Sequence, residues 1–365
     1  MKVRLSWVRK VFSLALCALT ATLSVPFSMT TVHAAGASEL RDSASGVILY
    51  DRDEDMAYEI GTAEELLAFS TLVSSGKKAI HAELTADIDM NPGYRFSFVA
   101  DTGLIEVRKD DSTVAYLGTG IRGDSSGTGT KFDSLASSAY KIYANTTGNN
   151  GVLPADLIAW KAIGTPNYAY AGTFDGQNHT IRGLFYNAST SKFGLFGQVD
   201  GASVKNLRLE NFCWNGNENL GGIIGLCKNA TVENCTVDGL LRGESHLGGV
   251  VGLVEKSTID NCRNDATIIG AKYFAGGIAG KTGNYDPVKL LNCANSGNIL
   301  ANADVTSMSE SDGGVGGIIG SYVATGDDCR VQSCSNSGTI RGFCCVGGIA
   351  GNVCPGQKDD LIVSN

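Results

Sequence analysis

The feature that most constrains the fold of this 365-residue chain is a glycine block that recurs six times in its C-terminal half. Each block reads Gly-x-x-Gly, and the blocks begin at Gly194, Gly222, Gly249, Gly277, Gly317 and Gly348. Successive blocks begin 28, 27, 28, 40 and 31 residues apart. A unit of about 27 residues with occasional insertions is typical of a stacked repeat, in which each unit contacts only its neighbours.

Two further positions recur in phase with the glycine block. The first is a pair with Asn or Ser followed by Leu or Cys: Asn206-Leu207, Asn234-Cys235, Asn261-Cys262, Asn292-Cys293 and Ser333-Cys334. The second lies six residues later, at Cys213, Leu241, Ile268, Ile299 and Ile340. Short aliphatic segments separated by Gly, Asn, Asp and Ser indicate strands and turns. One such unit cannot bury its apolar face, whereas stacked copies can, so we expect a mainly β fold, a right-handed parallel β-helix (β-solenoid).

The repeat also predicts what most of the 11 cysteines do. Cys17 lies within residues 1–34, which have the pattern of a cleaved signal peptide, so ten cysteines would remain, and an even number in a secreted chain normally indicates disulfides. Here, however, six of them share their repeat positions with Leu, Ile or Val, and we expect these six to be small buried hydrophobic residues: Cys213, Cys227, Cys235, Cys262, Cys293 and Cys334. The pairing of Cys329, Cys344, Cys345 and Cys354 stays open. The recurring Asn residues predict a stacked amide ladder that supports a turn.

Residues 1–34 have the pattern of a secretory signal peptide, with basic residues up to Lys10, an apolar stretch and small residues before position 35. The full chain has a formal charge of −8. This acidic balance argues against nucleic acid as a partner. We expect a secreted, extracellular protein, associated with a cell surface, that meets a membrane only through the cleaved signal or a missing anchor.

The rest of the chain divides by composition and pattern. We expect a polar lead at 35–56, an N-terminal cap of the solenoid at 57–90, a Gly-rich surface insertion at 91–159 and the β-helix at 160–365. Thr62 and Glu65 form a capping-box pattern that begins a short capping helix over 63–74. The sequence stops at Asn365, where the next Asn position is due, so we expect a solenoid truncated at its C-terminus.

Several of these segments resemble a known family. The Gly-Leu-Phe-Gly block at 194–197 and its five variants resemble the GLUG motif of bacterial secreted proteins, and the segments at 60–67, 84–89, 160–164 and 172–184 are similar to the sequences that introduce such repeats. The GLUG repeat occurs in surface adhesins and in the non-catalytic β-helix region of IgA-specific metallopeptidases. The resemblance covers about 60–90 and 160–365, and it implies an adhesin-like, extracellular β-helix.

The sequence carries few signals of catalysis. His81, His179 and His246 have no second His or Glu at zinc-binding spacing, and the chain lacks a nucleophile elbow and a phosphate-binding loop. The acidic stretch 51–55 begins like a calcium loop, but Met56 and Thr62 replace the required Gly and Glu. We therefore expect no metal site, no cofactor and no enzymatic activity.

One short motif bears on binding. Arg122, Gly123 and Asp124 spell the integrin-recognition tripeptide within the Gly-rich insertion, where a loop can present the carboxylate to a partner's metal ion. The sequence as a whole favours an adhesin-like binding or display module, whose partner is a host or neighbouring-cell surface protein or glycan. Two alternatives remain open: the non-catalytic substrate-binding region of a longer secreted peptidase, and a glycan-active β-helix lyase or hydrolase.

Overall fold

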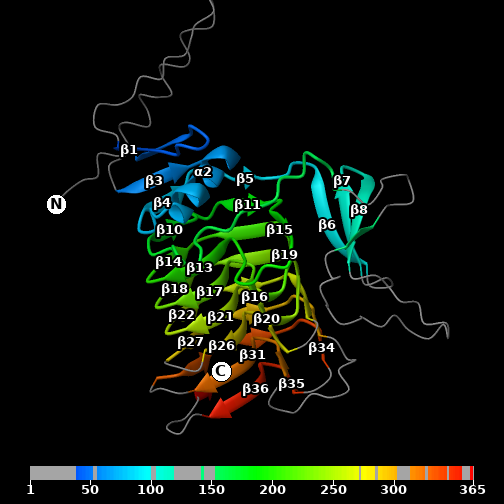
Figure 1. Ribbon diagram of the computed structural model, residues 1–365. Coiled ribbons are helices and arrows are strands. Elements are labelled where there is room, and N and C mark those ends of the chain that lie inside the picture. The colour runs from blue at the N-terminus through cyan, green and yellow to red at the C-terminus, as the bar shows by residue number, and fades with distance from the viewer. Residues whose placement is uncertain are drawn as a thin grey trace, which may run out of the picture. The chain divides into compact units, whose positions relative to one another are not determined.

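Each repeat of the chain forms one coil of a parallel β-solenoid, as the glycine period predicts. The computed structural model describes residues 38–51, 56–99, 104–118, 141–143, 153–270, 273–283, 287–301, 313–324, 328–342, 345–355 and 362–364. The segment Ser38–Asn365 forms one unit. Within its described part, equivalent strands of successive coils pair in parallel and build the walls of the solenoid (Figure 1). No helix in these ranges is long and apolar enough to cross a membrane.

Sheet A is the longest wall of the solenoid. Its strands are β1 (Ser38–Arg41), β2 (Ile48–Asp51), β3 (Ala57–Ile60), β4 (His81–Leu84), β10 (Thr173–Asp175), β14 (Ser203–Lys205), β18 (Thr231–Glu233), β22 (Thr258–Asp260), β27 (Lys289–Leu291), β32 (Arg330–Gln332) and β37 (Ile362–Ser364). The first three pair antiparallel with one another, and the strands from β3 onward pair in parallel. An antiparallel sheet edge therefore precedes the first regular coil.

Sheet B follows sheet A in each coil. Its strands are β5 (Ile88–Asp89), β11 (Thr180–Arg182), β12 (Phe185–Asn187), β15 (Arg208–Asn215), β19 (Thr236–Gly243), β23 (Arg263–Asn264), β24 (Thr267–Gly270), β28 (Ala294–Asn295), β29 (Ile299–Ala301), β33 (Ser335–Asn336) and β34 (Ile340–Arg341). In the middle coils the wall is continuous, because β15 and β19 each span both halves of it.

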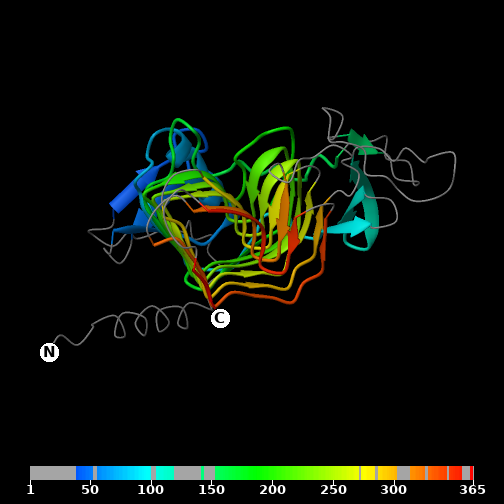
Figure 2. The same cartoon turned by 90° about the horizontal axis from the view of Figure 1, so that it is seen from below.

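Two shorter walls complete each coil. Sheet C contains β13 (Phe196–Asp200), β17 (Ile224–Lys228), β21 (Val251–Glu255), β26 (Ala279–Thr282), β31 (Ile319–Ala324) and β36 (Ala350–Pro355). Sheet D contains β16 (Glu218–Gly221), β20 (Ser245–Gly248), β25 (Phe274–Gly276), β30 (Gly314–Gly316) and β35 (Val346–Gly347). Seen along the stack, the coils follow one another closely (Figure 2).

The glycine blocks stand in register, as predicted. The pairing of sheet C places Gly225, Gly252, Gly280, Gly320 and Gly351 opposite one another in successive coils. The first glycine of the block is needed where coils approach closely. A Cβ on Gly277, for example, would lie 2.2 Å from the carbonyl oxygen of Gly317 and 2.4 Å from Cγ of Asn295. The block therefore recurs because backbone and side chains leave no room for a larger residue.

The capping helix is also confirmed. Helix α2 spans Ala63–Ser74, and Thr62 and Glu65 form the expected reciprocal capping box. Its apolar face is buried, and Phe69 packs against Tyr170 and Phe174 with ring centroids 5.8 and 5.9 Å apart. The helix therefore shields the apolar interior at the first coil, which a stacked repeat needs at its ends.

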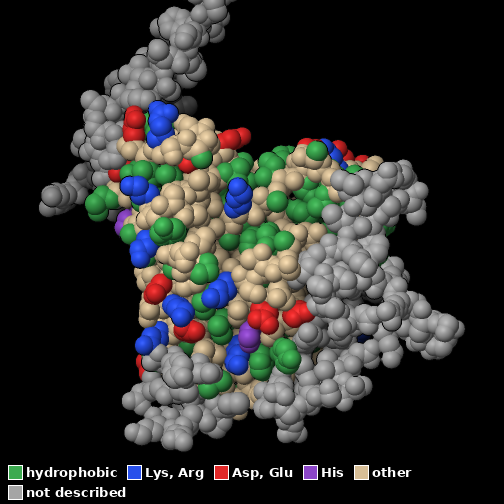
Figure 3. Space-filling model, viewed as in Figure 1, with side chains coloured by type: hydrophobic (Ala, Val, Ile, Leu, Met, Phe, Trp, Pro, Cys, Tyr) green, Lys and Arg blue, Asp and Glu red, His purple; other side chains and the backbone are tan. Residues whose placement is uncertain are grey.

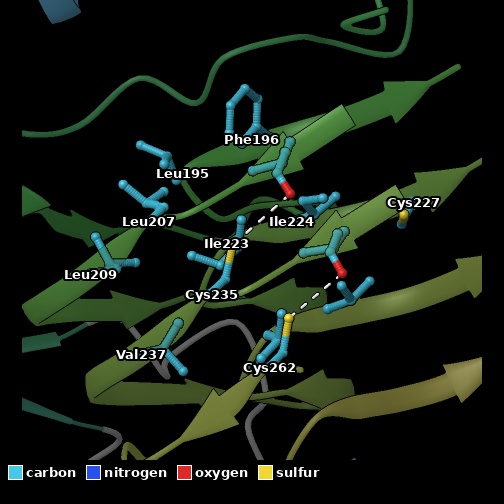
Figure 4. Packing of buried hydrophobic residues seen from close by; sticks show 14 of the residues in the cluster. Leu195, Phe196, Leu207, Leu209, Ile223, Ile224, Cys227, Cys235, Val237 and Cys262 are labelled. Carbon is cyan, nitrogen blue, oxygen red and sulfur yellow. Dashed lines mark hydrogen bonds between the residues drawn. The ribbon is translucent and has the colours of Figure 1, made fainter. Parts of the chain in front are cut away.

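The cysteines behave as buried hydrophobic residues, as predicted. The six are free thiols, and all but the half-buried Cys334 are buried. The thiols of Cys235 and Cys262 point into the core and donate to the carbonyl oxygens of Val204 and Val232, at 4.0 and 3.6 Å (Figure 4). Cys329 and Cys345 are likewise thiols and not half of a disulfide, whereas Cys344 and the side chain of Cys354 lie outside the described part.

The Asn ladder is present over three coils and then changes partner. Asn234 donates to Asn206 at 3.0 Å, and Asn261 donates to Asn234 at 2.8 Å, each residue having a left-handed backbone. Asn292 keeps that backbone but donates to the carboxylate of Asp260 at 2.8 Å. Short polar side chains that tolerate positive φ explain why Asn recurs at this corner.

A second amide ladder, which the sequence analysis missed, lies inside the solenoid. Asn264 and Asn295 are almost fully buried, with exposed fractions of 0% and 1%. Asn264 donates to Asn295, and Asn295 donates to Asn336, both at 2.7 Å. These amides also bond to backbone groups of their own turns, so they close the junction between the two halves of sheet B.

Candidate functional site

The described part of the segment expected as a surface insertion contains an antiparallel sheet, which we call the lateral sheet. Its strands are β6 (Tyr94–Val99), β7 (Leu104–Lys109), β8 (Ser112–Gly118) and β9 (Lys141–Tyr143). One face of this sheet packs on the outer side of sheet B, where Tyr94, Ile105 and Val107 share a second apolar core with Phe185, Cys213 and Leu240. Strand β6 lies nearest to β15 and β19 (Figure 1).

A cleft of about 570 Å³ lies between β6 and sheet B. Its walls are formed by Phe96, Ser97, Phe98, Glu210, Asn211, Asp238, Gly239, Leu240, Thr267, Asn298 and Leu300. These residues come from β6 on one side and from the successive strands β15, β19, β24 and β29, with the residue before β29, on the other. The cleft therefore crosses several coils, and it combines apolar side chains with carboxylates, amides and hydroxyls.

A β-bulge at Asn211 holds the two walls together. The register between β15 and β19 shifts at this point, because Glu210 faces Asp238 while Phe212 faces Gly239. Asn211 has a φ of 49° and is left over as the extra residue of the bulge. Its side-chain Nδ2 donates to the carbonyl of Tyr94 at 2.8 Å, and its Oδ1 accepts from the backbone N–H of Phe96 at 3.4 Å.

Gly239 is the partner that lets the bulge form. A Cβ on this residue would lie 2.6 Å from the carbonyl oxygen of Phe212 and 2.5 Å from its ring. A sequence signal for the bulge exists, because 15 positions separate Leu207 from Gly222 and only 14 separate Cys235 from Gly249.

The same bulge corrects one sequence prediction. We expected Cys213 to share a repeat position with Leu241, but the register pairs Cys213 with Leu240 and Trp214 with Leu241. Cys213 therefore faces the second apolar core beneath the lateral sheet, and Trp214 faces the solenoid interior. The shift escaped sequence analysis because apolar residues stand side by side in both coils.

Aromatic and ionic contacts fix the β6 wall. The ring of Phe96 stacks on Phe185 with centroids 5.4 Å apart and planes 23° from parallel. The hydroxyl of Tyr94 donates to Asp156 at 2.7 Å, and Lys109 pairs with the same carboxylate. Burial and the bond to Asp156 raise the pKa of Tyr94, while the bonds from Lys109 and Tyr94 lower the pKa of Asp156.

Three carboxylates stack along the opposite wall. Glu210 faces Asp238 in the next coil, and the register continues to Asp265. Arg182 and Arg208 lie 4.0 and 3.3 Å from carboxylate oxygens of Glu210.

Asp238 and Asp265, the second and third carboxylates of this stack, have pKa values that are shifted in opposite directions. Burial raises the pKa of Asp265, but hydrogen bonds from Arg263 and Ser296 outweigh it, so that pKa lies below its usual value. Desolvation, then Asp265 and Glu210, raise the pKa of Asp238. No ion pair of Asp238 is found within the described residues.

The remaining predicted site lies elsewhere in the chain. Arg122, Gly123 and Asp124 fall outside the described residues. Among the residues that are described, no group of three or more His, Cys, Asp and Glu side chains is placed to hold a metal ion. On the face seen in Figure 3, acidic and basic side chains are interspersed over the coils.

Comparison with known proteins identifies the repeat. Residues 243–269 match the model of the GLUG motif. The chain contains a GLUG repeat. The matched residues run from the end of β19 through β20, β21, β22 and β23 into β24, so one GLUG repeat is one coil of the solenoid. The other glycine blocks stand in register with the one in this coil.

A curated protein and a solved structure are also similar to this chain. Halomucin from Haloquadratum walsbyi (strain DSM 16790 / HBSQ001) is 33% identical over 112 residues, which cover 28% of this chain and 1% of Halomucin. A crystal structure of a candidate immunoglobulin A1 protease from Bacteroides ovatus superimposes with a TM-score of 0.46 at 17% identity. That match covers 85% of this chain and 80% of the other. The chain thus spans a very small part of the curated relative.

Proposed function

We propose that this protein is an extracellular binding module, in which a rigid GLUG-repeat solenoid displays the cleft beside β6 to a ligand on a cell surface. The observation that carries the proposal is the cleft itself, because a cavity of about 570 Å³ is of the size that binding pockets have. Its walls stand on regular strands and are joined by the Asn211 clamp, so binding requires little ordering of the protein.

The GLUG motif and the signal-peptide pattern of residues 1–34 support an adhesin-like role outside the cell. Binding without catalysis accords with the absence of motifs for nucleophilic or metal chemistry in the sequence. We therefore propose that the ligand leaves the cleft chemically unchanged.

Binding of the labelled protein to an array of matrix proteins, mucin glycans and bacterial wall polysaccharides tests this proposal. We expect retention on one class of ligand, and we expect Phe98→Ala to weaken it because Phe98 lines the cleft. Tyr168→Ala is the matched control, since Tyr168 is 43% exposed and does not line the cleft. Equal binding by wild type and Phe98→Ala would show that the cleft is not the binding site.

One observation favours a second function, glycan cleavage. Desolvation raises the pKa of Asp238, which faces Glu210 across the coil step, and a carboxyl pair in which one member has a raised pKa is an arrangement that general acid–base catalysis uses. Mass spectrometry of retained glycans separates the two functions. A cleaved glycan that the wild type forms and the Asp238→Asn variant does not form would show that the protein is an enzyme and not a binding module.

A further inference from the structure

Three polar side chains of the cleft have no hydrogen-bond partner within the described part of the chain. They are the carboxylate of Asp238, the hydroxyl of Thr267 and the amide of Asn298. They lie on β19, on β24 and just before β29, so they come from three successive coils. At about 4.8 Å per coil step, they span roughly 10 Å along the solenoid axis. The sheet B wall of the cleft therefore presents a row of hydrogen-bonding groups to a ligand.

Apolar side chains lie beside this row. Leu240 faces Thr267 in the next coil, and the register of the following step places Asn298 opposite Thr267. Leu300 lies two residues after Asn298, so both point to the same face of the sheet and both line the cleft. A sugar ring has hydroxyls at its rim and C–H groups on its faces. It can therefore bond to the polar row while its faces contact Leu240 and Leu300.

A peptide strand fits the cleft less well than a glycan. Asn211 accepts from the N–H of Phe96 and donates to the carbonyl of Tyr94, so these two backbone groups of β6 are occupied. Phe98 and Val99 of the same strand have interaction partners as well. An added strand would have to displace these contacts, whereas sugar hydroxyls need only the side chains of the opposite wall.

The charges of the cleft favour a neutral ligand. Arg182 and Arg208 lie 4.0 and 3.3 Å from carboxylate oxygens of Glu210, so this side chain is already paired. A cation would have Asp238 as its partner, and a single ion pair at an exposed carboxylate contributes little affinity. An anion would find no Lys or Arg among the residues that line the cleft.

We propose that the cleft binds a neutral, linear glycan that lies along the solenoid axis, with its hydroxyls bonded to Asp238, Thr267 and Asn298. The carboxylate accepts from a sugar hydroxyl, while the threonine hydroxyl and the amide both donate and accept. Because the row crosses successive coils, a longer oligosaccharide should bind more tightly than a disaccharide of the same sugar. This inference rests on the proposed binding function and names its ligand class.

Binding of the full chain to immobilised tetrasaccharides of glucose, mannose, galactose and N-acetylglucosamine tests the inference. We expect saturable binding of at least one of them, with weaker binding of its disaccharide. Asp238→Ala, Thr267→Val and Asn298→Ala should each weaken binding by about three- to tenfold, the loss expected for one hydrogen bond.

Thr258→Val is the matched control for Thr267→Val. Both threonines are half-buried first residues of a strand, but Thr258 lies on β22 in sheet A and does not line the cleft. The control should bind as the wild type does. An equal loss in both variants would overturn the inference, because the loss would then not depend on the cleft.

Two other results would also overturn the inference. One is no retention of any neutral tetrasaccharide, and the other is tighter retention of a chitosan tetramer or a galacturonate tetramer, which carry positive and negative charge. In either case a protein ligand from the array whose retention is lost in Phe98→Ala would still support the proposed function. The failure of the glycan assignment and the failure of the binding function are therefore distinguishable.

Discussion

At the residue scale, the buried thiols and amides of the solenoid show how a stacked repeat uses small side chains. Cys235, Cys262 and Cys293 replace a leucine of the first coil without any change of fold, since a thiol fills space and donates to a nearby carbonyl. Buried Asn264 and Asn295 must instead be satisfied by their neighbours in the stack. Replacement by an apolar residue should therefore cost little stability at the repeat position of Cys235, Cys262 and Cys293. The same replacement should cost much more stability in the buried amide ladder.

Cys262→Val should lower the free energy of unfolding by about 1 kcal/mol or less, because the change nearly conserves volume. Cys262→Asp should prevent cooperative folding, because it buries an unpaired charge. In the wild type, burial and the nearby Cys235 raise the pKa of Cys262, so this thiol should resist alkylation until the protein is denatured. Intact-mass analysis after alkylation of the native and of the denatured protein measures this resistance. Rapid labelling of Cys262 in the native protein would contradict its role as a buried hydrophobic residue.

His246 should make the fold sensitive to acid. Burial, and then Lys281, lower the pKa of His246 to about 4, whereas an unfolded histidine titrates near 6.5. Between these values the unfolded chain binds the extra proton, so the contribution of His246 is complete above pH 6.5 and falls as the pH drops. The loss should be roughly 1–2 kcal/mol between pH 7.5 and pH 5.

Urea unfolding of wild type and His246→Asn at pH 7.5 and pH 5 measures this loss. Asn suits the left-handed backbone of position 246, as Asn219 shows at the same place in the preceding coil. The variant should lose the part of the pH dependence that His246 causes. An unchanged difference between the two pH values would refute the role of this histidine.

At the scale of the elements, the glycine block specifies how closely two coils approach. Gly277 and Gly348 occupy the same position of the block in different coils, and their surroundings differ. A Cβ on Gly277 would overlap the next coil, while a Cβ on Gly348 would meet no atom of the described residues within 4 Å. The position thus requires Gly where described atoms of a following coil lie against it.

These two glycines form a matched pair for mutation. Gly277→Ala should destabilise the protein by about 1–3 kcal/mol, because β25 and β30 would have to separate. Gly348→Ala should change stability by less than about 0.5 kcal/mol. Thermal unfolding of both variants decides the matter, and equal effects would mean that backbone freedom, rather than contact between coils, explains the glycine.

At the scale of the whole molecule, the solenoid and the lateral sheet are joined through the bulge residue Asn211 and the core around Phe185. Asn211→Gly should keep the bulge, since glycine accepts the left-handed backbone, while removing both bonds to β6. We expect faster amide hydrogen exchange in β6 and unchanged exchange in β17 and β21. Unchanged exchange in β6 would show that the apolar core alone holds the lateral sheet.

The amino-acid sequence alone determined the solenoid, its period, the capping helix and the burial of the thiols. These features follow from a pattern that repeats within about 27 residues, so each coil carries its own strands, turns and inward-facing side chains, and stacking only copies the pattern. Thr62 and Glu65 mark the helix for the same local reason.

Only the tertiary structure decided the cleft. Its walls meet through a bond between Phe96 and Asn211, which are 115 residues apart, and through a one-residue bulge hidden by the neighbouring apolar residues Cys213 and Trp214. The carboxylates Glu210 and Asp238 come together only when two coils stack in register. Pairings of this kind depend on the fold of the whole unit, because each of them joins residues that lie far apart in the sequence.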